Sequence, residues 1–147
     1  ADAQVATQVL LAEALRLYFA KDLVYALARL DEAMHVIRKN TLRSNFIAMV
    51  YSWRATVLRE LLQQESSDGS LDKRYLHRTK QAVRAARFMA WSYPLERPHA
   101  LREAGEVALL QGRHEKATHF FQSSIKEAER LEMSHEADRA NARLNDA

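Results

Sequence analysis

The chain has 147 residues, 28% of them charged, with three glycines, two prolines, no cysteine and a net charge of +3. This length suits a single domain over residues 1–147, and the scarcity of glycine and proline favours an all-α chain with short connections. The absence of cysteine excludes disulfides and thiolate metal sites and suits a reducing, cytoplasmic compartment. No apolar run approaches the roughly 18 residues that a membrane-spanning helix needs, so we expect no membrane partner.

The first two predicted helices cover residues 3–20 and 22–39 and share one pattern. In the second of them, Ala26, Leu30 and Ala33 place a small, a large and a small residue along one face, and Ala14 stands ahead of them in the first. Small residues at such a spacing let the two antiparallel helices of a hairpin approach closely. We therefore expect these helices to form a first hairpin.

The middle of the chain is predicted to form a second hairpin. Asn40 and Thr41 provide a helix stop and an N-cap, so a third helix is expected from there to residue 64. Residues 66–70, with the sequence Ser-Ser-Asp-Gly-Ser, form the clearest loop in the chain. A fourth helix is predicted over residues 71–92, where Pro94 stops it.

The last third of the chain repeats the pattern of the first hairpin. Pro98 suits the first turn of a fifth helix, and Gly112 suits the position just after its end. A sixth helix is predicted over residues 114–131, and the small and large residues of this third pair are Gly105, Ala117, Phe121 and Ser124. Ser134 suits the N-cap of a short seventh helix, whose narrow apolar stripe is typical of a terminal cap.

These spaced residues resemble the tetratricopeptide repeat, a hairpin of two helices in a unit of about 34 residues. The first and last pairs match its small and aromatic positions, whereas the middle pair, with Ala55, Ala82 and Pro94, fits only with an insertion. The resemblance implies antiparallel helix hairpins stacked as a short right-handed solenoid, about three pairs plus a C-terminal capping helix. Residues 101–144 are also similar to the C-terminal helical arms of multidomain signalling ATPases, cyclases and kinases.

The first predicted helix is apolar around most of its circumference, through Val5, Val9, Leu10, Leu11, Leu15, Leu17, Tyr18 and Phe19. A helix of this kind is normally buried on both sides. We therefore expect a neighbour in front of it, either a preceding domain of the same chain, a second copy or another protein. The alternative is that the second and third helices cover it. Because the chain begins at Ala1 without an initiator methionine, we expect it to be a processed product or an excised fragment. The resemblance of residues 101–144 implies that it is the C-terminal part of a larger signalling or regulatory protein.

The resemblance also implies a partner-binding groove, lined by the first helix of each pair. Its apolar end would be formed by Leu11, Leu15 and Tyr18, and its polar end by Arg59, Arg102 and Glu106. Leu11 and Leu15 occupy the places where the family's carboxylate clamp has lysine and asparagine, so that clamp does not transfer to this chain. The expected function is a non-catalytic scaffold for a protein or peptide partner; an unoccupied, solvated groove is the alternative.

The fourth predicted helix carries a basic face, formed by Lys73, Lys80, Arg84 and Arg87 together with His77. Such a face could bind a polyanion, either nucleic acid or an acidic surface, through salt-dependent contacts. An ordinary solvent-exposed helix side explains the same pattern, and the small net charge gives nucleic acid no further support. Polyanion binding is therefore the alternative function.

The sequence contains no pattern that predicts catalysis, a cofactor or a metal ion. His114, Glu115 and His119 resemble a zinc-protease motif, but the second histidine is one residue late. The two imidazoles would lie about 140° apart around the helix, so they cannot share an ion. The other histidines, among them His99, are expected to be exposed or to cap helices. We therefore expect no enzymatic activity.

Overall fold

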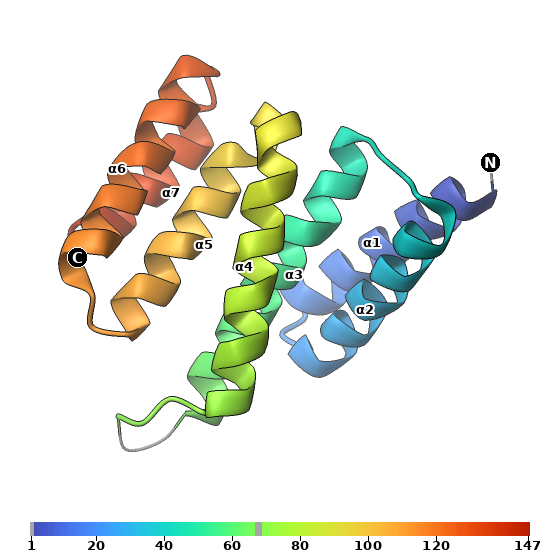
Figure 1. Cartoon of the computed structure of the whole chain (residues 1–147), viewed down its shortest axis with the longest axis horizontal. Helices are drawn as coiled ribbons and strands as arrows, with labels where there is room; N and C mark the ends of the chain where they lie inside the picture. The colour runs from blue at the N-terminus through green and yellow to red at the C-terminus, as the bar shows by residue number, and fades with distance from the viewer. Residues whose placement is uncertain (1, 67–68) are drawn as a thin grey trace.

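The computed structural model describes residues 2–66 and 69–147, and its helices follow the predicted order (Figure 1). Ser67 and Asp68, in the middle of the predicted loop, lie outside the described residues, as does Ala1. The helices are α1 (Asp2–Phe19), α2 (Leu23–Asn40), α3 (Asn45–Glu65), α4 (Lys73–Ser92), the short 3₁₀ helix η1 (Pro94–Glu96), α5 (Arg97–Leu110), α6 (His114–Arg130) and α7 (Ser134–Leu144). The described chain is thus an all-α, helical repeat-like fold.

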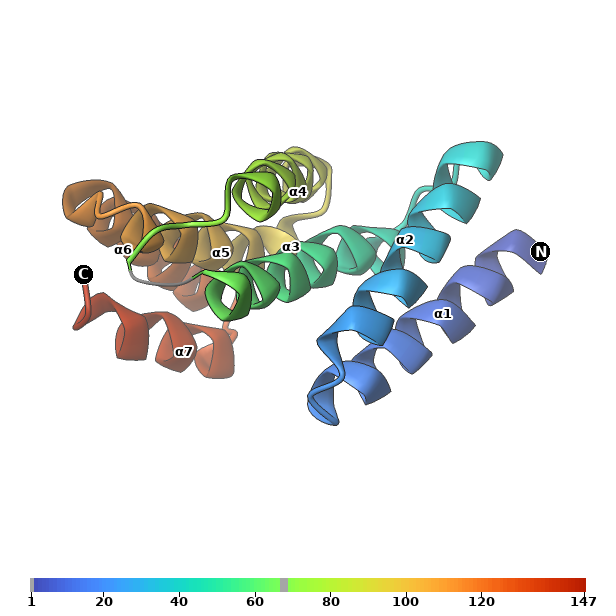
Figure 2. The ribbon, with the colours of Figure 1, turned by 90° about the horizontal axis from the view of Figure 1, so that it is seen from below.

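Helices that follow each other in sequence pack side by side, so the chain runs across Figure 1 from the first hairpin to α6 and α7. The odd-numbered helices also touch one another in the order α1, α3, α5 and α7. By contrast, the backbones of α4 and α6 do not approach each other within the described chain. Figure 2 shows α4 and α7 on opposite sides of α3 and α5. The odd-numbered helices therefore form one layer, and the gap between α4 and α6 on the other layer lies over α5.

The small residues that the repeat pattern singled out lie at the helix contacts. Ala14 of α1 and Ala26, Leu30 and Ala33 of α2 are all buried. In the third pair, a Cβ atom added to Gly105 of α5 would lie 2.6 Å from Cε1 of the buried Phe121 ring. The absence of a side chain at residue 105 therefore gives the ring its place, as the pattern predicts.

Most of the connections are tight turns in which the first or second residue after a helix adopts a left-handed backbone. Gly112 does so after α5 with φ of 72°, as predicted. Lys21, Thr41 and Glu132 adopt the same conformation after α1, α2 and α6, although none is a glycine. In each turn the next amide donates a hydrogen bond back to a carbonyl in the last turn of the helix, which satisfies otherwise unpaired backbone groups.

Two predicted N-caps are wrong. Thr41 belongs to the turn after α2, and α3 is capped instead by Ser44, whose hydroxyl accepts a hydrogen bond from the Ile47 amide at 3.2 Å. Residues 41–44 connect α2 to α3, so α3 begins at Asn45 and not directly after Thr41. Ser134 is the first residue of α7, and its neighbour Met133 takes the cap position without a side-chain hydrogen bond.

Helix α1 buries only one side. Leu10, Leu11 and Ala14 belong to the core, whereas Val5 is 57%, Val9 52% and Phe19 66% exposed. Helices α2 and α3 therefore do not cover the outer side of α1, and within the described chain this apolar side is open to solvent. None of the described helices has the length and apolar content needed to cross a lipid bilayer.

Candidate functional site

A groove of about 480 Å³ opens on the layer of odd-numbered helices, and we call it the inner groove. Side chains from α1, α3, α5 and α7 line it, namely Tyr18, Phe19, Trp53, Thr56, Arg59, Gln63, Arg102, Glu103, Glu106, Arg139, Ala142 and Arg143. It lies where the repeat resemblance implies a partner-binding surface. Four helices from four parts of the sequence therefore contribute to one concave surface.

The inner groove brings together four of the six predicted groove residues, Tyr18, Arg59, Arg102 and Glu106. The other two do not line it. Leu11 is 4% exposed and belongs to the core, because α1 turns that side toward α2. Leu15 is half-buried and packs against the same core. The apolar end of the groove is therefore formed by other residues than the two leucines.

Three aromatic rings form that end instead. The centroid of the Tyr18 ring lies 5.1 Å from that of Phe19 and 5.2 Å from that of Trp53, both in edge-on geometry. Tyr18 and Trp53 are half-buried, while Phe19 projects into solvent at the last turn of α1. Burial and the neighbouring Glu60 carboxylate raise the pKa of Tyr18 to about 12, so its hydroxyl keeps its proton at neutral pH.

The polar wall of the inner groove is built around Glu103, a buried carboxylate of α5 that the sequence analysis did not single out. Arg59 donates to both of its oxygens, from Nε at 2.8 Å and from Nη2 at 2.9 Å. Burial opposes ionisation, but the charge and hydrogen bonds of Arg59 prevail and lower the pKa of Glu103 to about 2. This pair ties α3 to α5 through a carboxylate that stays charged.

The hydrogen-bond chain continues from Glu103 to a buried histidine. Thr56 Oγ1 donates to Glu103 Oε1 at 2.7 Å and lies 2.7 Å from His99 Nε2. Because the hydroxyl has one proton and the carboxylate takes it, His99 must donate from Nε2 to Thr56. Burial and the nearby Arg102 charge lower the pKa of His99 to about 4, so the ring is neutral. The prediction that His99 is exposed or a helix cap is therefore wrong.

The remaining predicted polar residues are also paired within the chain. Arg102 of α5 forms an ion pair with Glu136 of α7, and Glu106 forms one with Arg143. Both pairs join the last hairpin to α7 across the groove wall. The polar side of the inner groove is therefore largely neutralised by its own ion pairs, whereas its aromatic end remains unpartnered.

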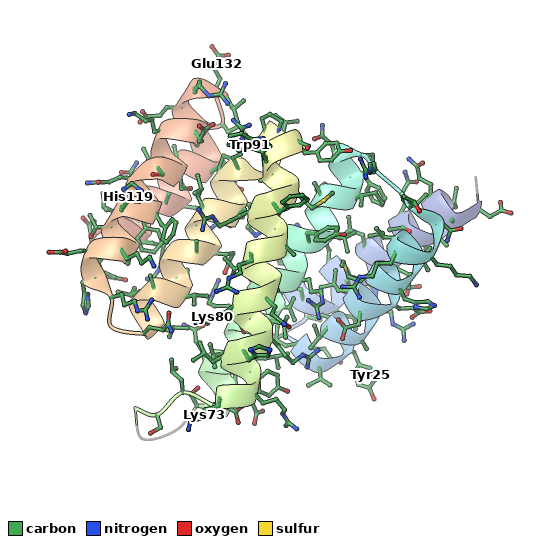
Figure 3. All side chains as sticks on the ribbon, in the orientation of Figure 1. Tyr25, Lys73, Lys80, Trp91, His119 and Glu132 are labelled. Atoms are coloured by element: carbon green, nitrogen blue, oxygen red, sulfur yellow. The ribbon has the colours of Figure 1, made fainter. Side chains whose placement is uncertain are left out.

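The predicted basic face of α4 is divided by the structure. Lys80, Arg84 and Arg87 line a second hollow, on the other layer of the molecule, between α4 and α6. Lys73 does not line it and lies at the other end of α4, next to the loop (Figure 3). Sequence periodicity along α4 could not show that α5 and α6 form the rest of this hollow.

His114 and His119, the two histidines that were compared with a zinc-protease motif, lie on α6. His114 and His119 are both exposed on α6, and His119 is on its outer side (Figure 3). In the part of the chain that the structure describes, no three His, Cys, Asp or Glu side chains are grouped so that they could hold a metal ion.

No protein-family model matches the chain, and searches of curated proteins and of solved structures find no match either. The function must therefore be argued from the geometry of the two surfaces.

Proposed function

We propose that the chain is a non-catalytic interaction domain, of the scaffold or regulatory kind, that binds a peptide or protein segment in the inner groove. In this proposal the hairpins are tetratricopeptide-like and stack as a short right-handed solenoid. The small residues buried at the hairpin contacts and the groove on the layer of odd-numbered helices support it. A rigid layered fold suits binding, because the surface is formed before the partner arrives.

The observation that carries the proposal is the exposed aromatic end of the groove. Phe19 is 66% exposed, and it stands beside Tyr18 and Trp53 at the edge of a concave surface. Covering an aromatic or aliphatic side chain is worth about 1.5–3 kcal/mol, and aromatic contacts add about 0.5–1.5 kcal/mol. A partner that places one apolar side chain here would gain most of its binding free energy from this contact.

The polar wall would favour some partners by excluding those that place a charged side chain against it. Arg59, Arg102 and Glu106 already hold ion-pair partners, so a charged partner residue would have to compete with Glu103, Glu136 or Arg143. Breaking such a half-buried pair leaves one charge without its counter-ion and costs several kcal/mol. We therefore expect the preferred segment to carry an apolar anchor followed by uncharged polar residues.

Selection of short random peptides displayed on phage tests this proposal. Peptides selected on the unmodified chain should bind Phe19→Ser about tenfold or more weakly, because the substitution removes the anchor contact. Val24→Ser is the matched control, since Val24 is similarly exposed on α2 but lies outside the inner groove. Circular dichroism should show both variants folded, because neither side chain belongs to the core.

The outcome that contradicts the proposal is equally definite. If no peptide is selected, or if the selected peptides bind Phe19→Ser as tightly as the unmodified chain, the inner groove is not the binding surface. If Val24→Ser weakens binding and Phe19→Ser does not, the surface lies on the outside of the first hairpin instead.

A further inference from the structure

On the layer opposite the inner groove, α4 and α6 stand apart over α5 and leave what we call the outer groove. It consists of two adjoining hollows of about 190 and 230 Å³ that share Arg87. Val83 of α4 and Ala104, Val107 and Ala108 of α5 contribute apolar surface to the first. The outer groove uses different residues from the inner groove, so it is a separate surface.

The first hollow is surrounded by five cations, Lys80, Arg84, Arg87, Arg113 and Lys116. Three come from α4, and the other two come from the start of α6 and the residue before it. No acidic side chain of the described chain lines this hollow, and none of the five cations has a described carboxylate within 4.0 Å. An anion placed here would relieve the mutual repulsion of these charges.

An aromatic ring in the lining of the hollow contacts one of these cations. The guanidinium carbon of Arg87 lies 4.9 Å from the centroid of the half-buried Phe120 ring of α6. This cation–π contact bridges α4 and α6 without neutralising the charge. The guanidinium is thus oriented beforehand and keeps hydrogen-bond donors for a carboxylate.

The second hollow has the opposite character. Trp91 is 80% exposed at the end of α4, with Leu101 of α5 nearby in the lining (Figure 3). Arg97 fixes this end, because it donates hydrogen bonds to the carbonyls of Ala90 and Trp91, each at 3.0 Å. Glu127 also lines the hollow and pairs with Arg97 at 3.9 Å, so the charge that Arg97 brings to this end is compensated.

We propose that the outer groove binds an acidic peptide segment in an extended form. Aspartate or glutamate residues of the segment contact the five cations, and an aromatic or aliphatic residue beside them packs on Trp91. A peptide matches this surface because its charge can be confined to one end and its apolar side chain to the other. Nucleic acid carries a phosphate at every nucleotide, so a strand along the groove would bring negative charge next to Glu127.

A synthetic peptide tests this proposal by fluorescence anisotropy. The probe is a labelled peptide with four glutamates followed by glycine, leucine and phenylalanine, and a second peptide has the reverse order. The double variant Arg113→Glu/Lys116→Glu should weaken binding about tenfold or more, because two attractive charges become repulsive. The matched control Lys39→Glu/Lys126→Glu changes the net charge equally at exposed positions that line neither hollow.

Trp91→Ser separates the two ends of the site. This substitution should weaken binding of the first peptide, in which leucine and phenylalanine follow the glutamates. It should not weaken binding of a peptide with serines in place of these two residues. The proposal is overturned if neither the first peptide nor the peptide of reverse order binds, or if the control double variant weakens binding as much as Arg113→Glu/Lys116→Glu. It is also overturned if Trp91→Ser has no effect on binding of the first peptide. It is also overturned if single-stranded DNA of similar length binds more tightly and loses affinity with Arg113→Glu/Lys116→Glu, since the groove then binds nucleic acid.

Discussion

Replacement of Gly105 by alanine tests the close contact between α5 and α6. An added Cβ would lie 2.6, 2.8 and 3.0 Å from three carbons of the Phe121 ring, whereas ordinary contacts are 3.4–4 Å. The ring has no exposed surface, so it cannot swing into solvent to make room. Either the ring leaves its preferred position or α5 and α6 move apart, and both changes disturb a close-packed contact.

Two opposing effects set the magnitude. Alanine in place of glycine within a helix favours folding by about 1 kcal/mol. Overpacking a rigid core costs about 1–3 kcal/mol, and three overlapping contacts on one ring place Gly105→Ala near the upper end. The expected net effect is a decrease of about 2 kcal/mol in the free energy of unfolding.

Urea denaturation followed by circular dichroism measures this difference. Ala12→Gly, at an exposed position of α1, calibrates the helix-propensity effect in the same chain and should cost about 1 kcal/mol. In a Phe121→Leu background the ring is gone, so the penalty of Gly105→Ala should shrink by about 1 kcal/mol or more. The reasoning fails if Gly105→Ala is as stable as the unmodified chain, or if its cost is the same in both backgrounds.

Three further predictions concern the hydrogen bonds between and within helices. Thr56→Val leaves Glu103 and His99 without the hydroxyl that joins them and should lower the free energy of unfolding, measured by urea denaturation, by about 2 kcal/mol. Thr56→Ser keeps the hydroxyl and should retain most of this stability. Because folding lowers the pKa of His99 from 6.5 to about 4, the unfolded chain binds more protons between these values. The free energy of unfolding should therefore fall by about 3 kcal/mol as the pH drops from 6.5 to 4. If a His99→Gln variant shows the same pH dependence of this free energy, the effect does not come from His99. Ser44→Ala removes the cap of α3 and should lower the free energy of unfolding, measured by urea denaturation, by about 1 kcal/mol, whereas Ser44→Asp should not.

The sequence was sufficient to predict the helices and the hairpin contacts, because both depend on local spacing. Small residues such as Ala26 and Gly105 recur at a fixed distance from large ones, and such a repeat is visible without coordinates. The helix ends were harder, since Lys21, Thr41 and Glu132 adopt a backbone conformation that glycine normally indicates. The residue types at these three positions do not indicate a left-handed backbone conformation.

The candidate sites were predicted only in part, because they depend on contacts between distant segments. Tyr18 and Arg59 were expected to line a groove because of their positions on the first helix of a pair, and both line the inner groove, whereas Leu11 faces the core. The importance of Glu103 follows only from its contacts with Thr56 and Arg59 on another helix. Periodicity within one helix does not show which side another helix will cover.

Helix α5 separates the inner groove from the outer groove. Arg102, Glu103 and Glu106 face the inner groove, while Ala104, Val107 and Ala108 line the outer one. All of these lie within a helix of 14 residues that touches α3, α4, α6 and α7. A shift of α5 toward one groove would narrow that groove and widen the other, so the two surfaces of the molecule share a single structural element.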